Sequence, residues 1–180
     1  MSNIYIALVH HPIYNKRKDI VTTCITGFDL HDIARTALTY GVKKYFVVNP
    51  LKAQMAFANR IVDFWMDEAS QEFNWTRAEA FKLLSVKENL DDVLAELPKN
   101  VKVIATSAKP KGAVTFEKLR KEIKASKGPY LVLFGTGWGM TDEVLEKADA
   151  VLEPIKGVSD YNHLPVRSAI AIILDRLLGR

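Results

Sequence analysis

Short runs rich in β-branched and aromatic residues alternate with amphipathic segments along this chain of 180 residues. The alternation is typical of a mostly parallel β-sheet with helices on both faces, which is an α/β fold. No stretch rich in glycine, serine and proline divides the chain, so we expect a single domain over residues 1–180. The runs expected to form strands are Ile4–Val9, Lys43–Val48, Val101–Thr106, Tyr130–Phe134 and Ala150–Leu152.

The helical segments carry apolar residues at intervals of three and four. The first helix is expected to begin near Asp29, because aspartate is favoured at the N-cap, and to end near Gly41. The last is expected at Pro165–Leu178, and its apolar surface extends beyond one stripe to Ile172 and Leu178. Such a helix is either deeply buried or packed against a second subunit. Further helices are expected at Ala53–Met66, Thr76–Leu84, Asn89–Leu97, Thr115–Ala125 and Thr141–Ala148.

The composition narrows the function classes. Cys24 is the only cysteine, so neither an intramolecular disulfide nor a site of several thiolates can form. The four histidines lack metal-ligand spacing, and no metal is expected. The apolar stretches are too short to span a bilayer, and the N-terminus lacks the features of a signal peptide. We therefore expect a cytoplasmic protein without a membrane partner.

Basic residues outnumber acidic residues by 25 to 21, which an ordinary soluble surface would also show. Their distribution is more informative. The run Lys16, Arg17 and Lys18 lies in a segment without a helical or strand pattern, and Lys109 and Lys111 flank a proline in another expected loop. Cations on loops suit contacts with phosphate groups, so these five residues are candidates for binding a nucleic acid.

The run Phe134–Met140, with the sequence FGTGWGM, directly follows an expected strand. Glycines allow the backbone to approach a ligand closely. A dinucleotide fingerprint requires G-x-G-x-x-G after an early strand, and a P-loop requires a lysine after its last glycine, so both common nucleotide motifs are excluded by spacing. A tight turn between strand and helix would explain one glycine well, but hardly three.

Two further polar loops follow strands, at 106–111 and 153–164. Ligands of open α/β sheets bind beyond the carboxyl ends of the strands. We expect these two loops and the glycine run to form one binding site together, although this placement does not name the ligand.

Arg35 is the charged residue most favoured for chemistry. It lies beside the apolar stripe of the first expected helix, with His31 one turn earlier on the same flank. A guanidinium group there could hold a phosphate or stabilise negative charge. The alternative is a surface pair with Asp32, which would contribute only a few tenths of a kcal/mol.

Four aromatic residues bracket an expected turn: Phe64, Trp65, Phe73 and Trp75. They are interpreted mainly as core or subunit contacts. A platform on which nucleobases stack is the less favoured alternative.

In this order the motifs resemble those of SPOUT-class RNA methyltransferases. Asp29–Ala37, followed by Tyr40–Val42 and Val47–Pro50, resembles the first motif of the class, roughly N-x-G-x-I-x-R-T-A, then F-G-V and a strand. Ala105–Lys109 resembles the strand-end motif T-[ST]-A-[RK]. The glycine run resembles the second motif, and Pro154–Gly157 with Leu164 and the last helix resembles the third.

The resemblance implies a methyltransferase that acts on RNA (tRNA or rRNA) with S-adenosylmethionine (SAM) as cofactor. It implies a deep trefoil knot near residues 101–180 and a homodimer joined through the C-terminal helix. It also implies that Arg35 orients a phosphate or the nucleophile, with Asn162 or His163 as partner, and that the five loop cations guide the RNA. The residues it places around the cofactor are Thr106, Ser107, Phe134, Gly135, Gly137, Pro154, Ile155, Gly157, Val158 and Leu164.

The chain departs from the branch of the class that methylates the ribose 2′-oxygen. That branch has a glutamate in its second motif, where this chain has Gly137 or Trp138, and an asparagine in its third, where this chain has Pro165. A base nitrogen therefore stands beside the ribose as the methylated position. Two other functions remain: an α/β module that only binds a nucleotide or effector, and a knotted RNA-binding protein that has lost catalysis.

Overall fold

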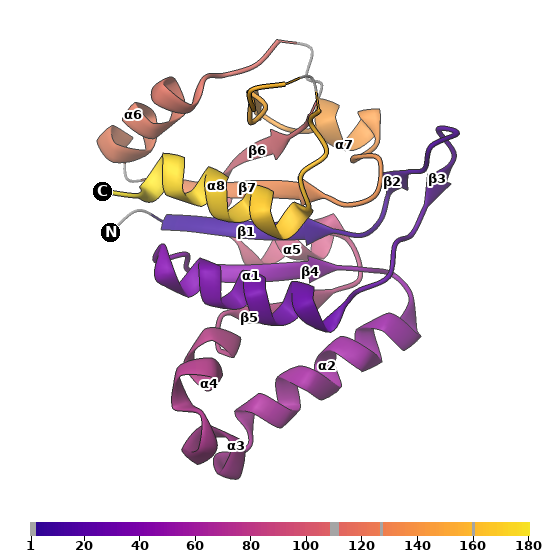
Figure 1. Ribbon diagram of the computed structural model, residues 1–180, viewed down its shortest axis with the longest axis vertical. Helices are drawn as coiled ribbons and strands as arrows, with labels where there is room; N and C mark the ends of the chain where they lie inside the picture. The colour runs from indigo at the N-terminus through magenta and orange to yellow at the C-terminus, as the bar shows by residue number, and fades with distance from the viewer. Residues whose placement is uncertain (1–2, 109–111, 127, 160) are drawn as a thin grey trace.

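All five runs predicted to be strands lie in one parallel sheet of the computed structural model, which describes residues 3–108, 112–126, 128–159 and 161–180. The sheet has the order β5-β4-β1-β7-β6-β8 (Figure 1). Its strands are β1 (Asn3–Val9), β4 (Lys44–Val48), β5 (Leu84–Lys87), β6 (Lys102–Thr106), β7 (Pro129–Gly135) and β8 (Ala150–Leu152). The chain thus has the α/β architecture that the sequence predicts.

Helices cover both faces of this sheet. They are α1 (Gly27–Thr39), α2 (Lys52–Met66), α3 (Glu68–Phe73), α4 (Trp75–Phe81), α5 (Leu90–Glu96), α6 (Phe116–Ser126), α7 (Asp142–Glu146) and α8 (Val166–Leu178). Helices α1, α6 and α8 pack on one face, and α5 and α7 on the other (Figure 1). Helices α2, α3 and α4 extend below the sheet beside β5, as Figure 1 shows.

The core follows from the alternation of side chains along the strands. Ile4, Ile6 and Leu8 of β1 join the apolar cluster under α1, α6 and α8, whereas Ala7 and Val9 join the cluster under α5 and α7. Leu30 and Ile33 of α1 are fully buried against the first cluster, and full burial of such a side chain stabilises the fold by about 1.5–3 kcal/mol.

Three expectations about element boundaries were wrong. The N-cap of α1 is Thr26, and Asp29 is the third helical residue, whose carboxylate accepts a hydrogen bond from the Thr26 main chain while the Thr26 side chain accepts one from Asp29. The helix expected at 76–84 ends at Phe81, because Leu84 begins β5 and pairs with Tyr45 of β4. Pro165 is the N-cap residue directly before Val166, the first residue of α8, rather than part of its first turn.

Helix α3 and the hairpin of β2 (Ile13–Tyr14) and β3 (Ile20–Val21) were not expected from the sequence. Each hairpin strand contains only two residues, which is too short to show a periodic pattern. The run Lys16–Lys18, for which no element was expected, lies at the tip of this hairpin.

The chain leaves β8 at one edge of the sheet and returns to its middle. Strand β8 lies at the edge of the sheet beside β6, whereas α8 packs against α1, α6 and β7. The connection between them, residues 153–165, therefore passes the carboxyl ends of β6 and β7 (Figure 1). This return brings the last loop of the chain onto the other two loops that the sequence singled out.

Candidate functional site

Three loops meet at the carboxyl ends of β6, β7 and β8, and we call them the loop cluster: residues 107–115, 136–141 and 153–165, the first and third as far as the structure describes them. The Asn162 amide nitrogen lies 3.4 Å from the carbonyl oxygen of Ala108, which joins the third loop to the first. The rings of Trp138 and His163 meet edge to face at 6.2 Å between centroids, which joins the third loop to the second. The expected gathering of these loops is therefore confirmed.

The glycine run has a structural reason at each glycine. Gly137 and Gly139 have positive φ angles of 54° and 101°, which side chains rarely tolerate. A Cβ atom at Gly135 would lie 2.8 Å from the Met140 side chain, and one at Gly137 would lie 2.9 Å from Cγ2 of Ile13. Packing and backbone conformation thus account for all three glycines, contrary to our expectation that a turn explains only one.

The β2–β3 hairpin is bound directly to the glycine run. The main chain of Trp138 donates to the Tyr14 carbonyl at 3.0 Å, and that of Tyr14 donates to the Gly139 carbonyl at 2.9 Å. The hairpin tip exposes Lys16, Arg17 and Lys18, and the Lys18 ammonium lies 4.6 Å from the centre of the Tyr14 ring. Three candidate cations therefore stand beside the loop cluster. Lys109 and Lys111 lie outside the described residues.

The third loop offers main-chain groups to a ligand. Among the described residues, the main chain of Ile155, Lys156, Gly157 and Val158 makes no recorded hydrogen bond within the chain. A Cβ atom at Gly157 would meet no atom within 4 Å. Such a segment can supply the donors and acceptors that a purine ring requires. Ile155 is half-buried beside it and offers an apolar surface.

The other residues expected around the cofactor have varied surroundings. Thr106 donates a hydrogen bond to the Leu133 carbonyl at 2.9 Å, and Phe134 is buried in β7. Val158 and Leu164 are exposed apolar side chains of the third loop. Pro154 and Ser107 lie on the third and first loops. A direct contact of these residues with a cofactor stays a prediction.

Arg35 lies on the outer surface of α1 and is exposed. Asp32, its expected alternative partner, instead pairs with Arg167 of α8 at 2.5 Å. Among the described residues, Arg35 makes no recorded side-chain hydrogen bond or ion pair, and it does not contact Asn162 or His163. One chain by itself therefore does not unite the three residues proposed for catalysis.

A buried polar network fixes the strand ends behind the loop cluster. His10 Nδ1 lies 2.9 Å from Oγ1 of Thr23, and that hydroxyl lies 2.5 Å from the hydroxyl of Thr136 on the glycine run. Burial lowers the pKa of His10 to about 4, against an opposing attraction by Asp29. The imidazole is therefore neutral near pH 7. No periodic pattern in the sequence indicates this network, because its members come from separate loops.

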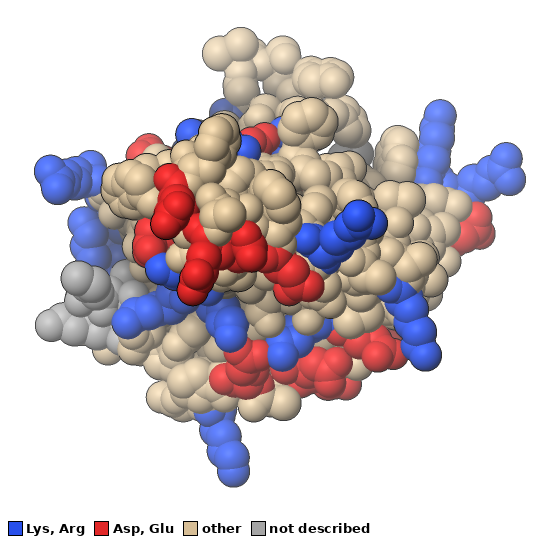
Figure 2. Space-filling view, turned by 90° about the horizontal axis from the view of Figure 1, so that it is seen from below, with Lys and Arg blue, Asp and Glu red and all other residues tan. Residues whose placement is uncertain are grey.

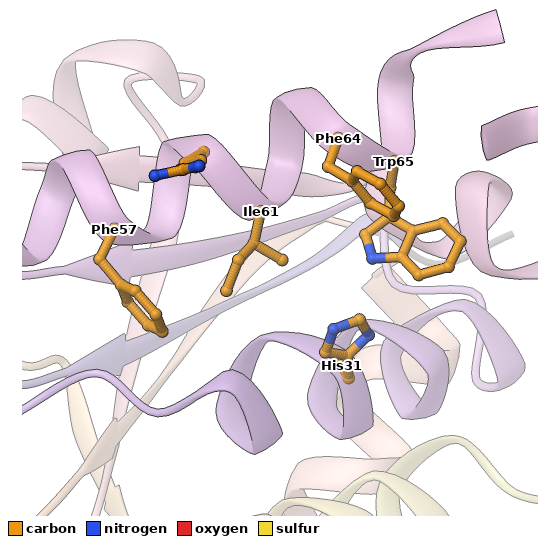
Figure 3. Close-up of a pocket in the computed structure, with 6 residues that line it drawn as sticks. His31, Phe57, Ile61, Phe64 and Trp65 are labelled. Atoms are coloured by element: carbon orange, nitrogen blue, oxygen red, sulfur yellow. The ribbon is translucent and has the colours of Figure 1, made fainter. Parts of the chain in front are cut away.

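A groove of about 490 Å³ lies elsewhere, between α1 and α2. Figure 3 shows His31 on α1 facing Ile61 and Trp65 of α2, with Phe64 beside Trp65 and Phe57 toward the other end of α2. Trp65 packs on His31 and Phe81, as expected for a core contact. Phe64, Phe73 and Trp75 are exposed at 59%, 88% and 68%, so the core interpretation is wrong for them in the single chain.

The charges beside this groove are nearly balanced. The segment of α2, α3 and α4, residues 52–82, carries four basic and five acidic side chains. The lower face of the molecule shows blue and red side chains intermingled (Figure 2).

No helix among the described residues is long and apolar enough to cross a membrane. Within the same described ranges, no group of three or more potential metal ligands occurs.

Comparisons with known proteins identify the family. The family model for SAM-dependent RNA methyltransferases matches residues 3–179. An uncharacterized protein of Aquifex aeolicus is 39% identical and covers 99% of this chain and 89% of its own length. A tRNA (guanine-N(1)-)-methyltransferase of Oleidesulfovibrio alaskensis is 38% identical over 98% of this chain, but the match spans only 42% of that protein.

The fold has solved relatives as well. The structure of the SpoU methyltransferase AviRb from Streptomyces viridochromogenes, solved in complex with AdoMet, matches 99% of this chain and 58% of that chain with a TM-score of 0.60. Its sequence is 12% identical, so the likeness concerns the fold alone. Together with the parallel sheet, it supports the SPOUT fold.

Proposed function

The chain belongs to the family of SAM-dependent RNA methyltransferases, and from this premise we propose that methyl transfer to RNA takes place at the loop cluster. The observation that carries the proposal is the convergence of three loops from β6, β7 and β8, joined by the Asn162–Ala108 and Trp138–His163 contacts. An α/β module that only binds an effector is not favoured, since the family is one of methyltransferases.

The residues present fit SAM. The free main-chain groups of residues 155–158 suit the adenine edge, and half-buried Ile155 suits its face. The cofactor supplies a methyl group that is already electrophilic, so no metal is required. We propose that the third loop holds the cofactor, with Phe134, Gly135, Gly137, Pro154, Gly157, Val158 and Leu164 around it. Thr106 at the end of β6 and Ser107 on the first loop would shape the rest of the site.

The remaining task for the chain is to orient the RNA nucleophile and to accept its proton. His163 is exposed at the loop cluster, and Asn162 beside it is fixed by its bond to Ala108. We propose that His163 accepts the proton and that Asn162 positions His163. Arg35 would hold a phosphate or the nucleophile. The cations Lys16, Arg17 and Lys18, with Lys109 and Lys111, would guide the RNA backbone.

In this proposal Arg35 reaches the loop cluster of a second copy of the chain. The outer surface of α1 exposes Phe28 at 67% and Leu38 at 41% on either side of Arg35, and α8 lies directly beside α1. Apolar side chains in such positions suit a symmetric interface. We propose a homodimer through α8 and α1 in which Arg35 of one protomer serves the loops of its partner.

The return of the chain from β8 to α8 past the first loop supports a trefoil knot near residues 101–180, in one domain over residues 1–180. We also propose that the protein acts in the cytoplasm, where tRNA and rRNA are found. Because the chain spans about 42% of its tRNA-modifying relative, tRNA is the first substrate to test rather than an established one.

The test is methyl transfer from radiolabelled SAM to bulk tRNA and to rRNA, followed by digestion to nucleosides. We expect label in one RNA fraction, and the labelled nucleoside separates a ribose oxygen from a base nitrogen. If the protein binds SAM by calorimetry but labels neither RNA, the catalytic proposal fails and the RNA-binding alternative replaces it.

A dimer is expected by light scattering. Arg35→Ala and His163→Ala, each with a strongly reduced rate alone, should regain up to about a quarter of the wild-type rate when mixed, because half of the dimers then contain one complete site. No recovery after exchange of subunits would contradict the shared site.

A further inference from the structure

Three exposed rings gather on the loop cluster: Trp138 of the glycine run, and Tyr161 and His163 of the third loop. The ring of His163 lies 6.2 Å from that of Trp138 and 5.4 Å from that of Tyr161, measured between centroids. Trp138 is 58% exposed and Tyr161 is 75% exposed. Large aromatic surfaces left open to water at a binding site are commonly covered by a ligand.

The cationic hairpin adds a second observation. Among the described residues, two main-chain hydrogen bonds join Tyr14 of the hairpin to the glycine run, and one of them is donated by the main chain of Trp138 itself. Lys16, Arg17 and Lys18 therefore extend from a hairpin that is hydrogen-bonded to the segment carrying the Trp138 ring. A groove that combines cations for the backbone with aromatic faces for the bases is the usual design of a site for single-stranded nucleic acid.

We propose that Trp138 and Tyr161 form a stacking platform for unpaired RNA nucleobases beside the methylated nucleotide, with the hairpin cations on the adjoining phosphates. The platform makes the enzyme select loops, bulges or ends over continuous duplex, because paired bases keep their faces covered. This inference rests on the proposed function and names the substrate class of the same site.

The aromatic residues of α2–α4 do not offer an equivalent site. Phe73 and Trp75 are at least as exposed as Trp138, but acidic side chains outnumber basic ones in that segment. With four basic and five acidic side chains, the segment has no excess of cations for contacts with phosphate groups. Trp75 therefore provides a matched control. It is an exposed tryptophan on α4, which lies beside β5 at the edge of the sheet opposite to β8.

The experiment measures fluorescence anisotropy of a labelled short single-stranded RNA of mixed sequence and of its duplex. The proteins are wild type, Trp138→Ala, Tyr161→Ala, the corresponding Trp138→Phe and Tyr161→Trp variants, and Trp75→Ala. We expect each alanine variant at the platform to bind the single strand about tenfold more weakly, and the aromatic replacements to retain most of the affinity. Trp75→Ala should bind like wild type.

Two further measurements separate stacking from other roles. The dependence of binding on salt should be unchanged by the platform variants and reduced by replacing Lys16, Arg17 and Lys18 with alanine. Only these cations neutralise RNA phosphates and so displace the counterions bound to them. SAM affinity by calorimetry should stay within about twofold of wild type in the platform variants, which also reports on folding.

Wild-type RNA binding in both alanine variants, or equal preference of the wild type for duplex, would overturn the platform. A matching loss of SAM affinity would also overturn it, since the rings would then belong to the cofactor site. The methyl-transfer assay of the wild type fails or succeeds independently of these binding results, so the two proposals are judged separately.

Discussion

Nη1 of Arg167 lies 2.5 Å from Oδ2 of Asp32, which ties the first turn of α8 to α1 across 135 residues of sequence. The same guanidinium group lies 5.1 Å from the centre of the exposed Phe28 ring. Asp32, which the sequence suggested as a partner for Arg35, is thus paired with Arg167 instead. Arg35 is therefore left available for a role outside this ion pair.

The contribution of this ion pair to stability should be small. Both side chains are more than a third exposed, at 38% and 45%, so solvent screens their attraction. A double-mutant cycle with Asp32→Ala and Arg167→Ala, measured by urea unfolding, should give a coupling energy below about 1 kcal/mol. A coupling of several kcal/mol would show that the pair is far better shielded than its exposure indicates.

Arg35→Ala should lower the rate of methyl transfer by about 100-fold while leaving SAM affinity unchanged, because the side chain is proposed to act on the RNA and not on the cofactor. Arg35→Lys should recover only part of the rate, since an ammonium group lacks the planar fork of donors. Arg60→Ala on α2 is the control and should behave like wild type. A wild-type rate for Arg35→Ala would remove the residue from the catalytic set.

Gly157→Ala should separate cofactor binding from folding. Its Cβ would meet no atom within 4 Å, and the backbone is not in the left-handed region, so the free energy of unfolding should change by less than about 0.5 kcal/mol. The added methyl group would project beside the main chain proposed to hold SAM, and we expect about tenfold weaker binding by calorimetry. Unchanged SAM affinity would argue against this part of the site.

Gly137→Ala should instead destabilise the fold. The residue has a φ of 54°, and the new Cβ would lie 2.9 Å from Ile13 and 3.2 Å from the Tyr14 carbonyl oxygen. Strain and overpacking together should cost about 1–3 kcal/mol, seen as a lower urea midpoint with an unchanged slope. Stability equal to wild type would mean that the hairpin moves away from the glycine run at little cost.

His10 should make the fold sensitive to acid. Burial lowers its pKa in the folded protein to about 4 from 6.5, so between these two values the unfolded chain binds a proton that the folded chain does not. Stability is therefore complete above pH 6.5 and falls as the pH drops toward 4, by up to about 3 kcal/mol. Urea unfolding across this range should show a smaller loss for His10→Gln than for wild type. Parallel curves for the two proteins would exclude His10 as the cause.

Local patterns in the sequence were sufficient for most of the sheet and the longer helices. The β-branched runs of β1, β4 and β7 and the apolar stripes of α1 and α8 depend on side chains that follow one another closely, so their periodicity is visible without a partner. The same local view misplaced the N-cap of α1, because both Thr26 and Asp29 are good capping residues and together form one capping box.

The sequence by itself determined the α/β class, the family resemblance and the three loops that carry the expected cofactor residues. Only the tertiary structure decided which side chains meet: the pairing of Asp32 with Arg167, the docking of the β2–β3 hairpin onto the glycine run, and the approach of Trp138 and Tyr161 to His163. Periodicity indicates which face of an element is buried, and it locates the end of an element to within a few residues. The return of residues 153–165 across the sheet depends on packing between distant elements, and no short stretch of sequence contains that information.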